Sequence, residues 1–186
     1  MISNVGDFDS VGKVILPGVG AFGDCMEALR SRKFEEPIKE LAGSGVWILG
    51  ICVGMQILGT FSEEFGYHDG LGIIPGGVRL IPNATPDGER LKRPHVGWSC
   101  LSSAEGDWGM TPLENICPET AVYFVHSYQL IPDDPKDILA YARYGGSLVS
   151  AGVRRDRVFG FQFHPEKSGY AGIEIIERFV RLVGGS

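Results

Sequence analysis

Short apolar runs alternate with amphipathic stretches along the first part of the chain. The runs Lys13–Leu16 and Val46–Leu49 are dominated by aliphatic residues, and such runs are typical of strands buried on both faces. Between them, Asp24–Leu29 and Phe34–Ala42 carry apolar residues at helical spacing, and Gly43-Ser44-Gly45 supplies a helix stop. The pattern predicts a strand, two helical segments and a second strand.

The second half of the chain contains one strand signal after another, with few helices between them. Glu63–Gly77 is expected to be a glycine-rich loop with acidic residues. Strands are predicted at Val78–Ile81, Ala121–Val125, Ile138–Tyr144, Val149–Arg154 and Val158–Phe163. A last helix is predicted over Gly172–Val183, with an apolar stripe formed by Ile173, Ile176, Phe179, Val180 and Val183. This order predicts an α/β fold whose sheet has an antiparallel extension.

Composition narrows the functional classes. The 186 residues suffice for one domain over 1–186 with a substantial core. A net charge of -6 argues against nucleic acid and anionic membranes as partners. The absence of a long apolar run and of a secretory n-region argues against a membrane segment or signal peptide.

The cysteines and histidines are dispersed. Cys25, Cys52, Cys100 and Cys117 form no CxxC pair, so we expect reduced thiols in a cytoplasmic protein. Except for Cys52, they are interpreted as packing residues. The histidines show no metal-ligand spacing, and neither a metal nor a cofactor is expected.

Cys52 lies between two glycines, in Gly50-Ile51-Cys52-Val53-Gly54, directly after an apolar run. A helix is expected to begin near Met55, so the pentapeptide is predicted to be a sharp strand-to-helix turn with strained backbone at Cys52. The helix dipole is expected to favour a thiolate. Glycines also flank many inert buried cysteines, so this motif requires a base.

A candidate base follows the last predicted strand. His164 could take the thiol proton, and Glu166 could hold its imidazole in the required tautomer. Taken alone, His164 is better explained as a satisfied histidine at a strand end. The combination of a cysteine turn with His164-Pro165-Glu166 favours a catalytic triad.

Five segments together resemble class I (triad-type) glutamine amidotransferases, in the order that this family has. They are Leu16–Gly23, Leu49–Gln56, Pro94–Trp98, Tyr123–Tyr128 and Gln162–Lys167. The resemblance implies a flavodoxin-like mixed sheet with flanking helices. It further implies hydrolysis of glutamine to glutamate and ammonia through a Cys52 thioester, within a glutaminase subunit of a synthase in histidine biosynthesis that makes imidazole glycerol phosphate.

The resemblance also assigns roles. The oxyanion donors would be the backbone amides of Val53 and Val19. The implied glutamine contacts are Gly18, Gln56, His126, Ser127 and Tyr128, and the implied contacts with a (β/α)₈-barrel cyclase, in a heterodimer, are Trp98, Tyr123 and Lys167. From the residues alone, Gln56 could face solvent, His126 could be a strand-end histidine, and Lys167 could be an ordinary surface lysine.

The chain departs from the family pattern at two places. The usual first strand-helix unit, ahead of the Pro-Gly-Val-Gly strand, is not found in Met1–Gly12, so an open sheet edge and exposed apolar surface are expected. Ser99 stands where the family usually has asparagine.

Three alternative functions remain open. Similar subunits serve amidine-forming synthases in surface-polysaccharide synthesis. A stand-alone γ-glutamyl hydrolase would use the same turn and histidine, and an inactive subunit could dock on a synthase without catalysing. Stimulation by a partner, or strong hydrolysis without one, would discriminate between these functions.

Overall fold

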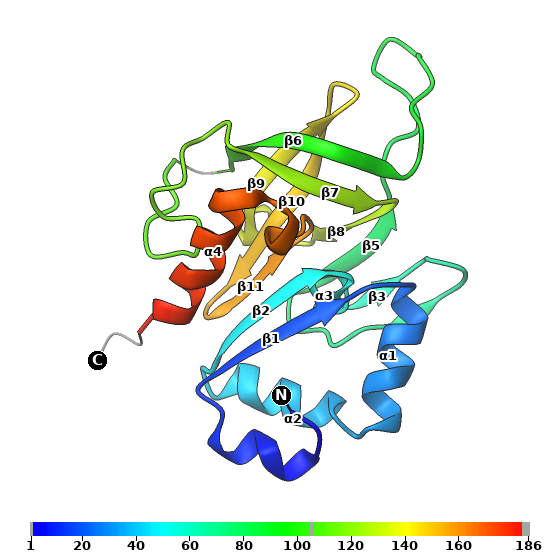
Figure 1. The fold of residues 1–186 in the computed structure, drawn as a ribbon. Helices are drawn as coiled ribbons and strands as arrows, with labels where there is room; N and C mark the ends of the chain where they lie inside the picture. The colour runs from blue at the N-terminus through cyan, green and yellow to red at the C-terminus, as the bar shows by residue number, and fades with distance from the viewer. Residues whose placement is uncertain (1, 105, 184–186) are drawn as a thin grey trace.

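The computed structural model describes residues 2–104 and 106–183, and a seven-stranded mixed sheet dominates it (Figure 1). The strand order is β1-β2-β11-β10-β9-β6-β7. The strands are β1 (Lys13–Gly18), β2 (Trp47–Cys52), β6 (His95–Ser103), β7 (Ala121–His126), β9 (Ile138–Tyr144), β10 (Ser147–Arg155) and β11 (Val158–Phe161). The predicted α/β fold with an antiparallel extension is confirmed.

Within the seven-stranded sheet, parallel pairing is confined to β1, β2 and β11. β2 pairs with β1 on one side and with β11 on the other, so the chain segments that contain Cys52 and His164 leave neighbouring strands at the same edge. All five residues of β2 from Ile48 to Cys52 are buried, which agrees with its continuous apolar sequence. The register therefore brings together two motifs that are far apart in the sequence.

A second, four-stranded sheet has the order β4-β3-β5-β8. Its strands are β3 (Phe61–Ser62), β4 (His68–Asp69), β5 (Gly76–Leu80) and β8 (Tyr128–Pro132). The expected loop over Glu63–Gly77 therefore includes β4 and the start of β5, and no strand was predicted for β6 or β8. β3 and β4 have only two residues each, too few to produce a recognisable alternation.

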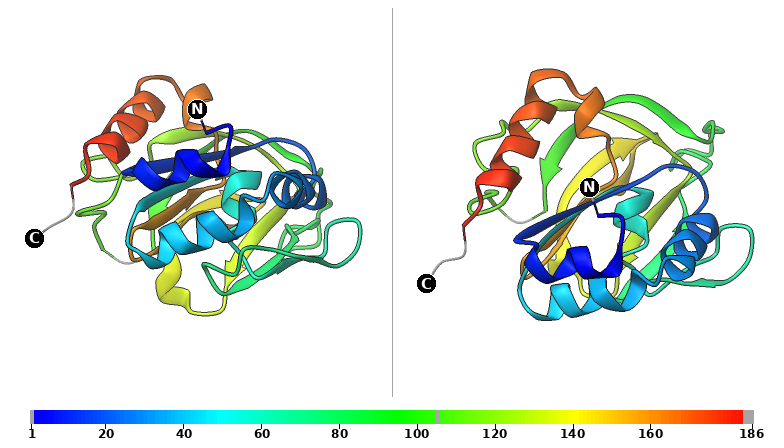
Figure 2. Two further views of the ribbon diagram at one scale, coloured as in Figure 1. Left: turned by 90° about the horizontal axis from the view of Figure 1, so that it is seen from below. Right: turned by 60° about the horizontal axis from the view of Figure 1, so that its bottom comes forward.

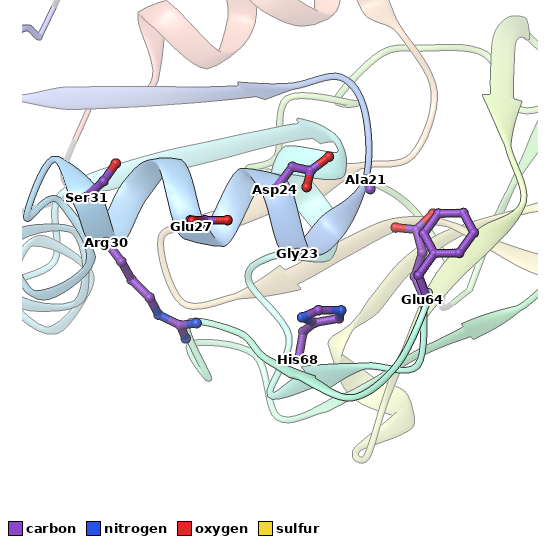
Figure 3. A pocket seen from close by; sticks show the side chains of 9 residues that line it. Ala21, Gly23, Asp24, Glu27, Arg30, Ser31, Glu64 and His68 are labelled. Carbon is purple, nitrogen blue, oxygen red and sulfur yellow. The ribbon is translucent and has the colours of Figure 1, made fainter.

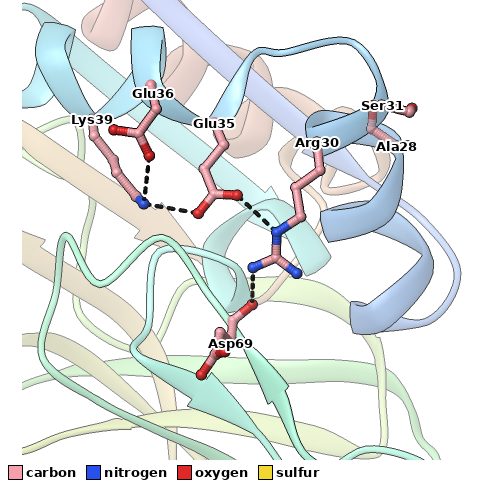
Figure 4. Close-up of polar contacts among 7 residues, drawn as sticks. All are labelled: Ala28, Arg30, Ser31, Glu35, Glu36, Lys39 and Asp69. Atoms are coloured by element: carbon pink, nitrogen blue, oxygen red, sulfur yellow. Dashed lines mark hydrogen bonds and ion pairs between the residues drawn. The ribbon is translucent and has the colours of Figure 1, made fainter.

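The longer helices are α1 (Phe22–Ser31), α2 (Glu35–Gly43) and α4 (Gly169–Arg181). Both Figure 1 and Figure 2 show α1 and α2 on one side of β1 and β2, and α4 on the other side. Figure 4 shows the polar contacts that join α1 to α2. Arg30 Nε lies 2.7 Å from Glu35 Oε2, Lys39 Nζ lies 2.8 Å from Glu35 Oε1, and Arg30 Nη2 donates to the Asp69 carbonyl of β4. Arg30 thus links α1 both to α2 and to the β3–β4 hairpin.

The predicted apolar stripe of α4 is wrong for most of its members. Ile173 and Val180 are 54% and 56% exposed, and Val183 lies beyond the end of the helix and is also exposed, whereas Gly172, Ile175 and Phe179 are buried. Because apolar residues occur around much of this helix, the sequence pattern alone does not fix which face packs on the sheet. Gly172 decides it, since a Cβ there would lie 1.8 Å from the Pro165 carbonyl oxygen.

β1 stands at the end of the strand order, and its Ile15 is exposed, as the expectation of an open sheet edge requires. The 3₁₀ helix η1 (Val5–Ser10) precedes it and packs Phe8 edge-on against Phe34. Cys100 and Cys117 are exposed, so their interpretation as packing residues is wrong. Within the described residues, no helix has both the length and the apolar character to cross a membrane.

Candidate active site

Cys52 occupies the sharp turn that the sequence predicts. Its backbone has φ 55° and ψ -113°, a region that non-glycine residues rarely adopt, at the junction of β2 and the one-turn helix α3 (Val53–Gln56). The neighbouring glycines allow this geometry. A Cβ on Gly54 would lie 1.8 Å from the Leu16 carbonyl oxygen, and one on Gly50 would lie 2.4 Å from the Gly54 carbonyl oxygen.

His164 follows β11 and is held by contacts on both its ring and its backbone. Its Nδ1 lies 2.7 Å from Glu166 Oε1, its backbone N–H donates to the Tyr123 carbonyl, and its own carbonyl accepts from Ser168 Oγ. Glu166 belongs to the short 3₁₀ helix η3 (Pro165–Lys167), and its side chain is half exposed. This contact favours a proton on Nδ1 and leaves Nε2 as the basic nitrogen.

Nε2 of His164 is buried and has no hydrogen-bond partner among the described residues. Cys52 and His164 form no hydrogen bond with each other within the residues that the structure describes. The two residues nevertheless line the same pocket. Catalytic hydrogen bonds are often long in a resting enzyme and shorten when substrate binds.

The thiol of Cys52 is protonated in this state. Burial raises its pKa to about 11, although the Val53 backbone N–H has the opposite effect. The charge on Glu166 raises it further. The expectation that the helix dipole favours a thiolate is therefore not met, because α3 is only one turn long and desolvation of the sulfur dominates.

The pocket around Cys52 has a volume of about 340 Å³. Nine of the residues singled out in the sequence line it: Val19, Cys52, Val53, Gln56, His126, Ser127, Tyr128, His164 and Lys167. Gly18, Trp98, Tyr123 and Glu166 lie outside its lining. Gly18 still contacts the turn, because a Cβ there would lie 2.5 Å from the Gly54 nitrogen.

The loop after β1 forms one wall of this pocket. Val19 is 81% exposed, and Gly20 has φ 104°, a conformation that favours glycine. The Val19 carbonyl accepts a weak hydrogen bond from Cys25 Sγ at 3.8 Å. Val19 and Gly20 of this loop therefore line the same pocket as Cys52.

Gln56 and Gln162 form a buried pair of amides beside Cys52. Gln56 Nε2 donates to the Tyr128 carbonyl and to Gln162 Oε1, both at 3.0 Å. Gln162 Nε2 points to Cys52 Sγ at 3.8 Å. Gln56 is therefore not the solvent-facing helix residue that its sequence position allowed, and Gln162 was not singled out as a site residue.

His126 is buried in a chain of ring contacts. Its Nδ1 lies 2.9 Å from the Tyr128 carbonyl, its Nε2 lies 3.2 Å from His95 Nδ1, and His95 Nε2 lies 3.0 Å from Ser99 Oγ. Burial lowers the pKa of His126 to about 4, so the ring is neutral near pH 7. Ser99, where the resemblance led us to expect asparagine, completes this chain.

Glu64 is a pocket residue that was not expected from the sequence. It lines the Cys52 pocket, and its Oε2 accepts a hydrogen bond from the Phe22 backbone N–H at 2.7 Å. It also lines an adjoining cleft between α1 and the β3–β4 region, together with Asp24, Glu27 and His68 (Figure 3). Its place in an acidic, glycine-rich loop was the available signal, but the loop's path was not predictable.

The residues expected at a partner interface lie on a neighbouring surface. Trp98 on β6 is directly opposite Tyr123 on β7, with ring centroids 6.0 Å apart, and Trp98 is 57% exposed. Lys167 is exposed at the pocket rim. The Tyr123 carbonyl accepts a hydrogen bond from the backbone N–H of His164, so one backbone contact joins this surface to the triad.

A strained cysteine turn, an Nδ1-anchored histidine and a mixed sheet with three parallel strands at one end define a triad-type amidotransferase. The chain belongs to the class I glutamine amidotransferase family, whose model matches residues 5–182. The predicted family membership is thereby confirmed.

The names of individual relatives are more specific than the name of the family. The chain is 46% identical over 184 residues to the imidazole glycerol phosphate synthase subunit HisH 1 of Legionella pneumophila (strain Lens), covering 98% of this chain and 86% of the relative. It is 47% identical to the HisH subunit of Sulfurimonas denitrificans, covering 94% and 81%. A crystal structure of a glutamine amidotransferase, 16% identical, matches the fold with a TM-score of 0.69, covering 97% and 84%.

Proposed function

We propose that this chain is the cytoplasmic glutaminase subunit of an imidazole glycerol phosphate synthase, in histidine biosynthesis. The observation that carries the proposal is the strained Cys52 turn sharing one pocket with His164, whose Nδ1 is anchored 2.7 Å from Glu166. Membership of the class I family supports the reaction type. The identity to HisH subunits supports the pathway.

In the proposed reaction, His164 Nε2 takes the proton of Cys52, and the sulfur attacks the side-chain carbonyl carbon of glutamine. His164 returns the proton to the departing nitrogen, so ammonia leaves and a γ-glutamyl thioester remains. Water, deprotonated by His164, then attacks the thioester and releases glutamate and the thiol. Glutamine and water are consumed, and glutamate and ammonia are formed.

The negative oxygen of each tetrahedral intermediate requires hydrogen-bond donors. The Val53 backbone N–H lies next to the sulfur, and the Val19 peptide group is the proposed second donor. Substrate would contact Gly18, Gln56, His126, Ser127 and Tyr128. The Glu64 carboxylate is the proposed partner of the glutamine α-ammonium, because it is an acidic group on the pocket wall.

The ammonia must reach an acceptor without protonation, since ammonium near neutral pH is not a nucleophile. A separate (β/α)₈-barrel cyclase subunit is the proposed recipient, docked in a heterodimer on Trp98, Tyr123 and Lys167. The raised Cys52 pKa and the unpaired His164 Nε2 support activation by this partner, because the unbound subunit holds its nucleophile in the protonated form.

Glutamate release from glutamine tests the proposal when measured with the chain alone, with the barrel cyclase, and with the cyclase and its nucleotide ligand. We expect at least a 100-fold rise with the liganded cyclase. Cys52→Ala should remove this activity and leave use of free ammonia by the cyclase intact. Glutamate release that persists in Cys52→Ala would refute the nucleophile.

The same assay separates the alternative functions. Rapid cleavage of γ-glutamyl peptides without any partner would indicate a stand-alone hydrolase. Activation by an amidine-forming synthase, and not by the cyclase, would indicate surface-polysaccharide synthesis. A folded chain that docks on the cyclase without releasing glutamate would indicate an inactive docking subunit.

A further inference from the structure

Gln162 is a fully buried polar side chain with no role in the reaction as written above. It lies two residues before His164 and is anchored through its backbone N–H, which donates to the Ala151 carbonyl at 2.9 Å. A buried amide costs free energy unless its polar atoms find partners. Its two contacts, with Gln56 and with Cys52, connect a substrate-contact residue to the nucleophile.

One group that can only accept hydrogen bonds determines which way the nitrogen and oxygen of both side-chain amides point. The Tyr128 carbonyl can only accept a hydrogen bond, so the nitrogen of Gln56 must face it. The second N–H of that nitrogen needs an acceptor, which is Gln162 Oε1. The nitrogen of Gln162 then faces Cys52 Sγ. The amide of Gln56 has both N–H groups committed and offers its oxygen to a ligand.

We propose that Gln162 is a positioning residue of the glutaminase site, in which its amide N–H faces the Cys52 sulfur and its amide oxygen fixes the orientation of Gln56. An N–H directed at sulfur stabilises the thiolate relative to the thiol. A fixed Gln56 presents its oxygen to the carboxamide or amine hydrogens of glutamine. This role deepens the proposed function and rests on it for the identity of the substrate.

Alkylation of Cys52 by iodoacetamide tests the first half without depending on glutamine hydrolysis. The rate is measured at about pH 8 by mass spectrometry of the Cys52 peptide, because the other cysteines also react. Loss of one N–H donor should reduce the thiolate fraction, and hence the rate, about 10-fold in Gln162→Met. Gln162→Leu provides the same measurement if the methionine variant does not fold.

Gln129→Met is the matched control. Gln129 is also a buried glutamine, and its oxygen accepts from the Ser150 backbone N–H at 2.8 Å, but it does not contact Cys52. In Gln129→Met, iodoacetamide should alkylate Cys52 at the wild-type rate. A wild-type rate in folded Gln162→Met or Gln162→Leu, or equal slowing in Gln129→Met, would overturn the inference.

Gln56→Met tests the orienting contact. Without the Gln56 donor, the Gln162 amide can turn its oxygen to the sulfur, so Cys52 alkylation should slow several-fold. An unchanged rate would overturn the orienting role. In the activated complex, Gln162→Met should raise KM and lower kcat together. If the wild-type complex hydrolyses no glutamine, the proposed function fails, while the alkylation rates still decide the role of Gln162.

Discussion

Cys52 combines two opposing features. Its backbone conformation directs the side chain into the pocket, while burial keeps the sulfur protonated by raising its pKa to about 11. The Val53 N–H lowers this pKa but does not offset the loss of water around the sulfur. The unbound subunit is therefore a weak nucleophile, and activation must change the surroundings of the thiol.

The first prediction concerns the pH dependence of this thiol. Because the pKa is raised, the thiolate fraction and the alkylation rate should rise about 10-fold per pH unit between roughly pH 7 and pH 9, without a plateau. The alkylation rate is measured at each pH by quenching the reaction at fixed times and quantifying the alkylated Cys52 peptide by mass spectrometry. A plateau at neutral pH would mean that the resting thiol is already ionised.

The second prediction compares the two other members of the triad. His164→Ala removes the base and should lower kcat about 10²–10⁴-fold. Glu166→Gln should cost less, because the histidine base remains and the half-exposed position of Glu166 lets water support Nδ1. Steady-state glutamate release with the liganded cyclase measures both. Equal losses would indicate that Glu166 does more than orient the ring, and no loss would indicate a structural residue.

The elements around the site are positioned by glycines that permit close backbone contact. Gly54 brings α3 onto β1, and Gly172 brings α4 onto η3. The first contact packs the helix that follows Cys52 against β1, and the second packs α4 against the helix that contains Glu166. The conformational freedom of glycine matters less at these two positions than the absence of a Cβ.

The third prediction follows from the first of these contacts. Gly54→Ala should lower the free energy of unfolding by about 1–3 kcal/mol, because its Cβ would overlap the Leu16 carbonyl. Urea unfolding followed by circular dichroism measures the change. Gly43→Ala is the control, since a Cβ there would meet no described atom within 4 Å apart from its chain neighbours and its own helix backbone. It should be neutral or slightly stabilising. Equal stability of the two variants would contradict the packing argument.

The whole molecule presents the pocket and the Trp98–Tyr123 pair at adjoining positions. The backbone contact between Tyr123 and His164 joins the expected docking surface to the triad. A partner that shifts β7 would therefore move His164 as well. This arrangement gives a physical route by which docking could shorten the distance between His164 and the thiol.

The fourth prediction concerns assembly. Trp98→Ala should weaken binding of the cyclase at least about 10-fold, since exposed tryptophans are frequent anchors of interfaces. Calorimetric titration with the cyclase measures the dissociation constant. Met110→Ala is the control, because Met110 is also an exposed apolar residue but lies beyond the other end of β6. Unchanged binding in Trp98→Ala would remove this residue from the docking surface.

The sequence by itself determined the features that depend on neighbouring residues. The turn at Cys52, the pairing of His164 with Glu166 two positions later, and the strand-helix alternation all follow from local sterics and short spacing. The family motifs extended this reading to most of the pocket lining, because their order along the chain is itself informative. These predictions hold without knowledge of the strand order.

Only the tertiary structure decided which distant groups meet and which are removed from water. The register of β6 against β7 places His95 opposite His126, and the neighbouring positions of β2 and β11 bring Gln162 to Cys52. The face of α4 that packs, the place of Glu64 on the pocket wall and the protonated state of Cys52 depend on the same packing. Burial and long-range contacts are properties of the assembled fold, so no local pattern encodes them.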